Sequence, residues 1–212
     1  MRRYRHAQPV RHALTTAAAL TLALAAAGCG ADDGTKEVSQ EGKGGYPWVA
    51  TDEICNSLPY EKLADPLGNR EEVADRAKRT GGGAPGFTCT QPLAERGAAR
   101  YGGVKVELDF AFTESVDFAK EVFAAGRKET HPTAPEGAQT EVKDVGREAT
   151  RFGYDKPNEL HQVRELRLRD SNLLLTVVVT ADARTEPTPE SLKAMDTAVD
   201  GFTRGVLDAV RK

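Results

Sequence analysis

The sequence is poor in the residues that build catalytic and metal centres. It contains three cysteines and four histidines, and no C-x-x-C pair occurs. There is no Gly-x-Ser-x-Gly motif, and the run Gly81–Gly83 lacks the Gly-Lys-Ser/Thr ending of a phosphate-binding loop. These absences argue against a zinc site, a thiol redox centre, a nucleophile-elbow hydrolase and a P-loop nucleotide enzyme. We therefore expect no metal, no cofactor and no catalytic residue.

Acidic residues are absent from the first 28 positions, which carry four of the 29 Lys and Arg residues. The remaining 184 residues hold 25 basic and 32 acidic side chains, a formal charge of −7. This balance argues against nucleic acid as a partner, because phosphate backbones require a basic footprint. It also provides no polybasic patch for an anionic membrane, so membrane attachment would depend on a lipid.

The N-terminal segment predicts export and lipid attachment. Four arginines precede an apolar run from Ala13 to Ala27, which is shorter than a spanning helix of about 20 residues. The junction Ala26-Ala27-Gly28-Cys29 resembles the lipobox of bacterial lipoproteins. The resemblance implies that residues 1–28 are a lipoprotein signal peptide and that Cys29 is lipidated, which would anchor the chain to the extracytoplasmic face of the cell membrane. The alternative is an ordinary secretory signal cut at Ala-x-Ala, with Cys29 incidental.

The rest of the chain is predicted to be a tether followed by one domain. Residues 29–45 are expected to be flexible, because they are mostly polar and contain a single valine. Residues 46–212 are long enough for one domain with a buried core. Once Cys29 is assigned to the lipid, Cys55 and Cys89 remain as an even pair in an oxidising compartment. This favours a disulfide over free thiols or metal ligands.

Alternating apolar and polar residues, and in Leu173–Thr180 a nearly continuous aliphatic and β-branched run, predict five strands. They are Phe87–Gln91, Val104–Phe112, Val145–Tyr154, Leu160–Arg169 and Leu173–Thr180. The last two are expected to form a hairpin through Asp170–Asn172, with a bulge near Arg164 because Val163 is out of phase with the leucines that follow it. The charged segment Asn69–Arg79 is expected to be a solvated excursion outside the core.

Start and stop residues predict a first helix within Ser57–Gly68. Apolar residues at helical spacing predict two more, within Glu114–Gly126 and Thr188–Val210. In the second, the residues expected on the core face are Val116, Ala119, Val122 and Phe123. The third is expected to begin with Thr188 as its cap and Pro189 in its first turn, and its core face is expected to hold Leu192, Met195, Val199, Phe202, Val206 and Val210. The order of the elements predicts an α+β fold, in which an antiparallel sheet of about five strands packs against helices.

Several short motifs occur together in this chain. Besides the lipobox and the polar tether, they are Cys55-Asn56-Ser57-Leu58, Cys89 in the first predicted strand, and Gly146-Arg147-Glu148-Ala149 ahead of Phe152 and Tyr154. The combination resembles the small actinobacterial lipoproteins of the "domain of unknown function 3558" type. The resemblance implies a PsbP-like sandwich, and it brings no enzymatic activity with it.

The sequence points to binding rather than catalysis. His131 precedes a proline in a loop and His161 lies on a strand, and both are expected to be exposed polar residues. Four charged residues are expected to form cross-strand ion pairs on a wet sheet face: Glu159, Glu165, Arg167 and Arg169. We predict a non-catalytic module that binds a small apolar ligand or an unknown envelope protein, with an apolar cleft between the sheet and a helix as its site. The alternative is an envelope hydrolase or transferase with an unrecognised site.

Overall fold

The computed structural model describes residues 45–46, 54–71, 86–96, 100–128, 139–155 and 160–211. Predictions that concern residues 1–44, Gly81–Gly83, His131 and Glu159 lie outside the described residues. The chain divides into two units, Met1–Thr35 and Lys36–Lys212. The second unit contains all the elements given below, the disulfide and the buried core, and is therefore the part expected to fold by itself.

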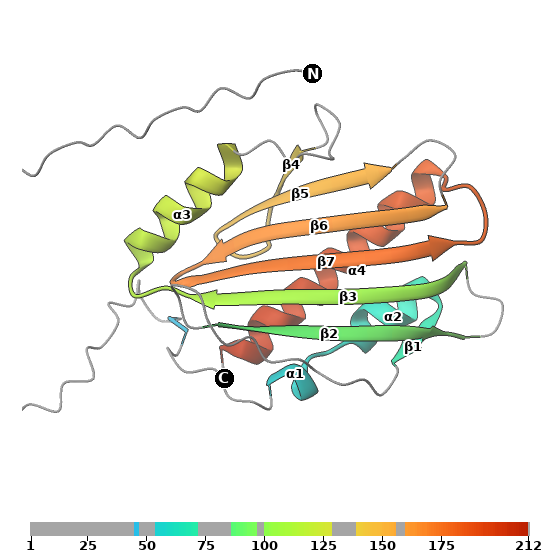
Figure 1. Cartoon of the computed structure of the whole chain (residues 1–212), viewed down its shortest axis with the longest axis horizontal. Coiled ribbons are helices and arrows are strands. Elements are labelled where there is room, and N and C mark those ends of the chain that lie inside the picture. Colours follow the sequence, from blue (N-terminus) through green and yellow to red (C-terminus); the bar gives the residue numbers. More distant parts are fainter. Residues whose placement is uncertain are drawn as a thin grey trace, which may run out of the picture. The chain divides into compact units, whose positions relative to one another are not determined.

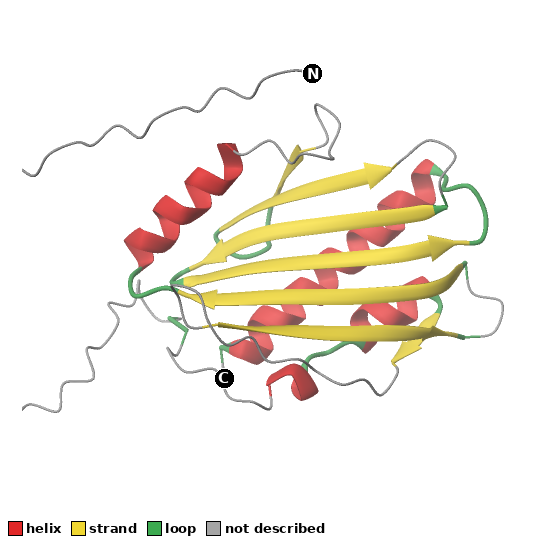
Figure 2. Ribbon diagram, in the orientation of Figure 1, coloured by secondary structure: helices red, strands yellow, loops and turns green. Residues whose placement is uncertain are grey.

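Helices and strands follow one another along the second unit as Figures 1 and 2 show. The helices are α1 (Ile54–Ser57), α2 (Glu61–Leu67), α3 (Val116–Lys128) and α4 (Pro189–Val210). The strands are β1 (Asn69–Glu71), β2 (Gly86–Glu95), β3 (Tyr101–Phe112), β4 (Gln139–Val142), β5 (Glu148–Asp155), β6 (His161–Asp170) and β7 (Leu173–Ala183). The three predicted helices correspond to α2, α3 and α4, and the five predicted strands to β2, β3, β5, β6 and β7.

The described strands form one antiparallel sheet in the order β1-β2-β3-β7-β6-β5-β4. The predicted α+β class is therefore confirmed, although the sheet has seven strands rather than about five. The two additional strands, β1 and β4, are edge strands of three and four residues. Strands of this length are too short to show a period of two in the sequence.

Alternation along the central strands separates the two faces of the sheet. Val106, Leu108 and Phe110 of β3 are fully buried, and so are their register partners on β7, among them Val177 and Val179. Helix α4 covers this face and runs behind the sheet in Figure 1. The side chains that alternate with the buried row face the other side, where α3 packs against β6 and β7.

Helix α4 supplies most of the helical contribution to the core. Five of the six residues predicted for its apolar stripe are buried, namely Met195, Val199, Phe202, Val206 and Val210. Thr188 caps its N-terminus as predicted: Ser191 N–H donates to Thr188 Oγ1 at 3.2 Å, and Thr188 N–H donates to Ser191 Oγ at 2.9 Å. Pro189 follows in the first turn, where its missing N–H is not needed.

Two predictions about local structure were wrong. For the predicted solvated segment Asn69–Arg79 the error concerns its start, since residues 72–79 lie outside the described residues. Asn69 begins strand β1, is fully buried, and donates from Nδ2 to Tyr101 O at 3.4 Å. The bulge near Arg164 is absent, because β6 pairs without interruption with both β5 and β7. Val163 is half-buried on the sheet face opposite α4, and Arg164 is buried on the α4 side, where its Nε pairs with Asp196 Oδ1 of that helix at 2.9 Å. The pattern required an apolar residue at position 164, but an arginine can occupy this buried position because Asp196 compensates its charge.

Tyr46, which precedes α1 in the sequence, is bound to the turn between β6 and β7. Tyr46 N–H donates to Asn172 Oδ1 at 3.1 Å, and the Tyr46 hydroxyl donates to Asp170 Oδ2 at 2.6 Å. Arg211, just after α4, pairs with the same Asp170 carboxylate. Burial, together with the neighbouring carboxylate, raises the pKa of Tyr46 above its ordinary value.

Candidate functional site

A cleft of about 450 Å³ lies between α3 and the sheet face opposite α4. Apolar side chains dominate its lining, with Val122 and Phe123 from α3 and Phe152, Leu174 and Val178 from the sheet. Its volume falls within the range of about 300–1,000 Å³ that is typical of small-molecule sites. The structure therefore has a cleft of the type expected from the sequence, an apolar space between the sheet and a helix.

The amphipathic pattern of α3 leaves this space open. Ala119 and Phe123 are buried against the sheet, whereas Phe118 and Val122 are 43% and 40% exposed. The prediction that Val122 lies on the core face was therefore wrong, because it stands at the rim of the cleft. Gly126 also lines the cleft, and a Cβ built on it would meet no atom within 4 Å.

The floor of the cleft includes a row of polar residues that the strand register places side by side. Thr150 of β5 pairs with Arg167 of β6, Arg167 with Thr176 of β7, and Thr176 with Asp109 of β3. All four line the cleft. The site is therefore an apolar space with a polar row crossing its floor, which is the usual composition of a site that orients a mostly apolar ligand.

Arg167 is held in place by two neighbours. Its Nε donates to Glu165 Oε1 on the same strand, and its guanidinium carbon lies 4.8 Å from the centre of the Phe152 ring. Glu165 is only 7% exposed, so its charge is compensated by Arg167 within a largely buried pair. These contacts fix the orientation of a guanidinium group at the cleft.

Thr150 is the unusual residue of the floor. It is 2% exposed, and its Oγ1 has no hydrogen-bond partner among the described residues. A buried hydroxyl without a partner costs about 1–3 kcal/mol. Because Thr150 lines the cleft, a molecule bound there is a candidate for the missing partner.

The predicted ion pairs on the sheet face are realised only in part. Arg169 of β6 pairs across the strands with Glu148 of β5, Nε to Oε2, at 2.8 Å, as expected. Arg167 instead pairs with Glu165 on its own strand. The face is also less wet than predicted, because Glu165 and Arg169 are both buried.

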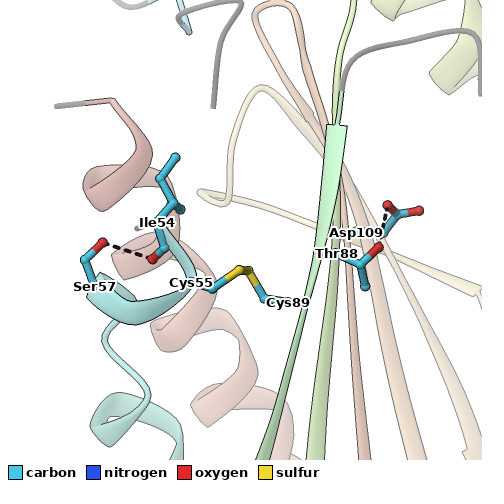
Figure 3. The surroundings of a disulfide bond; sticks show 6 residues. All are labelled: Ile54, Cys55, Ser57, Thr88, Cys89 and Asp109. Carbon is cyan, nitrogen blue, oxygen red and sulfur yellow. Dashed lines mark hydrogen bonds between the residues drawn. A yellow bond between two sulfur atoms is a disulfide. The ribbon is translucent and has the colours of Figure 1, made fainter. Parts of the chain in front are cut away.

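The predicted disulfide is present. Cys55 and Cys89 are bonded, with their Cα atoms 5.5 Å apart, and the bond joins α1 to β2 on the α4 side of the sheet (Figure 3). The adjacent Thr88 points to the opposite face, where its Oγ1 donates to Asp109 Oδ1 at 3.4 Å. The bond therefore lies on the other side of β2 from the cleft and has a structural role. The lipidation site Cys29 lies outside the described residues.

The remaining predicted polar residues do not join the cleft. His161 is exposed, as expected, and its Nδ1 lies 2.8 Å from Asp182 Oδ1. No group of three or more His, Cys, Asp or Glu residues suited to a metal ion occurs in the described part of the chain. Within the same residues, no helix has the length and apolar character needed to cross a bilayer.

Thr150 and Phe152 were not singled out from the sequence as site residues. Both belong to the predicted strand Val145–Tyr154, and nothing local distinguishes a threonine that faces a cleft from one that faces solvent. The alternation of Glu165 and Arg167 on β6 was a visible signal. It indicated a charged face, but it did not show that α3 and Phe152 enclose that face.

No family model matches the chain, and no curated protein is significantly similar to it in sequence. The solved structures that match the chain include the following two. The extracellular domain of PknH from Mycobacterium tuberculosis is 11% identical, with a TM-score of 0.39, over 76% of this chain and 100% of that one. A protein from Thermus thermophilus, TTHA0849, is 13% identical, with a TM-score of 0.25, over 76% of this chain and 90% of that one. Both TM-scores are below 0.5, so neither likeness bears on the function of this chain.

Proposed function

We propose that this protein is a lipid-anchored, extracytoplasmic binding module that takes a small, largely apolar ligand into the cleft between α3 and the sheet. The cleft itself is the observation that carries the proposal. It combines an apolar lining, a volume of about 450 Å³ and a buried hydroxyl, that of Thr150, without a partner among the described residues.

The chemistry of the cleft supports binding rather than catalysis. Among the described residues that line it there is no histidine, cysteine or serine to act as a nucleophile or general base. Its two carboxylates already have partners, since Glu165 accepts from Arg167 and Asp109 accepts from Thr88. We therefore propose that the protein is not an enzyme.

The proposed location rests on the N-terminal segment and the disulfide. The basic head, the apolar run and the Ala-Ala-Gly-Cys junction are typical of a lipoprotein signal that delivers Cys29 to a lipid. The Cys55–Cys89 disulfide is typical of an oxidising compartment outside the cytoplasm. We include the lipoproteins of the "domain of unknown function 3558" type in this proposal as the family that the motifs resemble.

The cleft can be tested by filling it. N-phenyl-1-naphthylamine, a neutral apolar dye, is expected to bind the unit Lys36–Lys212 with a rise in fluorescence. The variant Gly126→Phe should remove this rise, because Gly126 lines the cleft and a side chain there meets open space. Replacing a helical glycine does not weaken the helix, so α3 should remain folded.

The chain offers a matched control for this variant. Gly201 lies in α4 on the other side of the sheet, and a Cβ built there also meets no atom within 4 Å. Gly201→Phe should therefore bind the dye as the unmodified unit does. Equal binding by both variants, or no dye binding by the unmodified unit, would show that the cleft is not a ligand site.

A further inference from the structure

We propose that the cleft selects an apolar molecule with one anionic head, a carboxylate or a phosphate, and that Arg167 and Thr150 bind this head. The inference rests on the proposed function, because it assigns a ligand class to the same cleft. It depends on the geometry of two neighbouring polar groups on the floor.

Arg167 presents a cation whose position is already determined. Its Nε donates to Glu165, and its planar group lies over Phe152. Its two terminal nitrogens have no hydrogen-bond partner among the described residues. An arginine held in this way can donate from its outer edge to two oxygens of a carboxylate or phosphate, with little further loss of side-chain freedom.

Thr150 provides a second donor at the same place. It stands directly opposite Arg167 in the antiparallel register, so the two Cβ atoms are about 5 Å apart on one face. Its buried hydroxyl can donate to an oxygen that also accepts from Arg167. An anionic oxygen at this point would satisfy the unpaired Thr150 Oγ1 and the open edge of the guanidinium together.

The other charged residues of the cleft favour a position of the ligand's anionic head next to β5 and β6. Glu165 is compensated by Arg167, and Arg127 of α3 adds a positive charge at the exposed rim. Asp109 would repel an anion, but it lies two strands from Arg167, about 10 Å away, beyond Thr176. The apolar part of the ligand would then extend between α3 and the floor at Val178.

The ligand class can be tested with chain-matched competitors that differ only in the head. Decanoic acid, decyl phosphate, decanol and decylamine would each displace N-phenyl-1-naphthylamine from the unit Lys36–Lys212. The better of the two acids is expected to compete at a concentration at least about tenfold lower than decanol, as a charge-assisted hydrogen bond implies. Decylamine should compete least well. The order of the two acids identifies the head as carboxylate or phosphate.

Two variants connect this preference to the proposed residues. Thr150→Val should reduce the advantage of the acids without lowering the melting temperature, because it removes a buried hydroxyl that has no partner among the described residues. Glu165→Gln combined with Arg167→Gln should abolish the advantage without leaving a buried charge unpaired. The control is Arg204→Gln, which removes one positive charge from the exposed surface of α4 and should leave the preference unchanged.

The outcomes separate this inference from the proposed function. If the dye binds and Gly126→Phe blocks it, but decanol or decylamine competes as well as the acids, the anionic head is rejected and the cleft stands. The same holds if the acid preference survives both variants. If the dye does not bind to the unmodified unit, the cleft is rejected as a site and the anionic head with it.

Discussion

Breaking the Cys55–Cys89 bond is expected to lower the melting temperature of the unit Lys36–Lys212 by about 8–16 °C. The bond spans 34 positions of sequence. The chain-entropy treatment gives about 4 kcal/mol for a loop of this size, because the crosslink restricts the unfolded chain. For a domain of about 150–250 residues, each kcal/mol corresponds to about 2–4 °C in Tm.

The bond can be broken in two ways that leave different atoms behind. Reduction keeps both sulfur atoms, whereas the double variant Cys55→Ala/Cys89→Ala also empties the fully buried site of Cys89. The fall in Tm on reduction should therefore measure the loss of loop closure alone. The double variant should melt at a still lower temperature, because it also loses the packing of the two sulfur atoms. The unit contains no other cysteine, so reduction affects only this bond.

The measurement is thermal unfolding followed by circular dichroism, with mass spectrometry of unreduced peptides to verify the bond. A linked pair of peptides containing Cys55 and Cys89 is expected before reduction. A fall in Tm of less than about 3 °C after complete reduction, equivalent to roughly 1 kcal/mol, would refute the loop-closure reasoning. It would mean that residual contacts in the unfolded ensemble already keep the ends of this segment close together without the crosslink.

Two further predictions concern the N-terminal side of the protein. Cys29→Ala, expressed in an actinobacterial host, should move the protein from the membrane fraction to the medium or leave the signal uncut; normal processing with retention in the membrane would contradict lipid anchoring. Because the pKa of Tyr46 is raised in the folded state, its stabilising contribution should be complete below about pH 10 and decline at higher pH by about 1.4 kcal/mol per unit. Urea unfolding from pH 9 to 11 should show this decline, and Tyr46→Phe should remove it; an unchanged slope would exclude Tyr46 as its source.

Much of the fold could be predicted because the information lies within single segments. The alternation in Val104–Phe112 and the stripe of α4 each require only one apolar surface to lie against the element. The glycine of the Gly146-Arg147-Glu148-Ala149 motif also has a local reason. Its φ is +65°, and a Cβ there would approach Arg169 O to 3.0 Å.

The errors arose where a distant element determined the outcome. Arg164 is buried because Asp196 on α4 compensates its charge, and no property of β6 alone contains that information. Val122 has the spacing of a core residue, yet α3 lies against the sheet in a way that leaves it at the rim of the cleft. Strands β1 and β4 exist only as partners of β2 and β5.

The sequence by itself determined the strands and helices with a clear period, the cap at Thr188 and the pairing of Cys55 with Cys89. The first two depend on neighbours along the chain, and the pairing depends on the number of cysteines that remain once Cys29 is assigned to the lipid. Tertiary structure alone decided which residues form the candidate site, because Thr150 and Arg167 become neighbours only when the antiparallel register of β5 and β6 is established. The register and the position of α3 follow from burying apolar faces of segments far apart in sequence, and that pairing energy is not a property of any one segment.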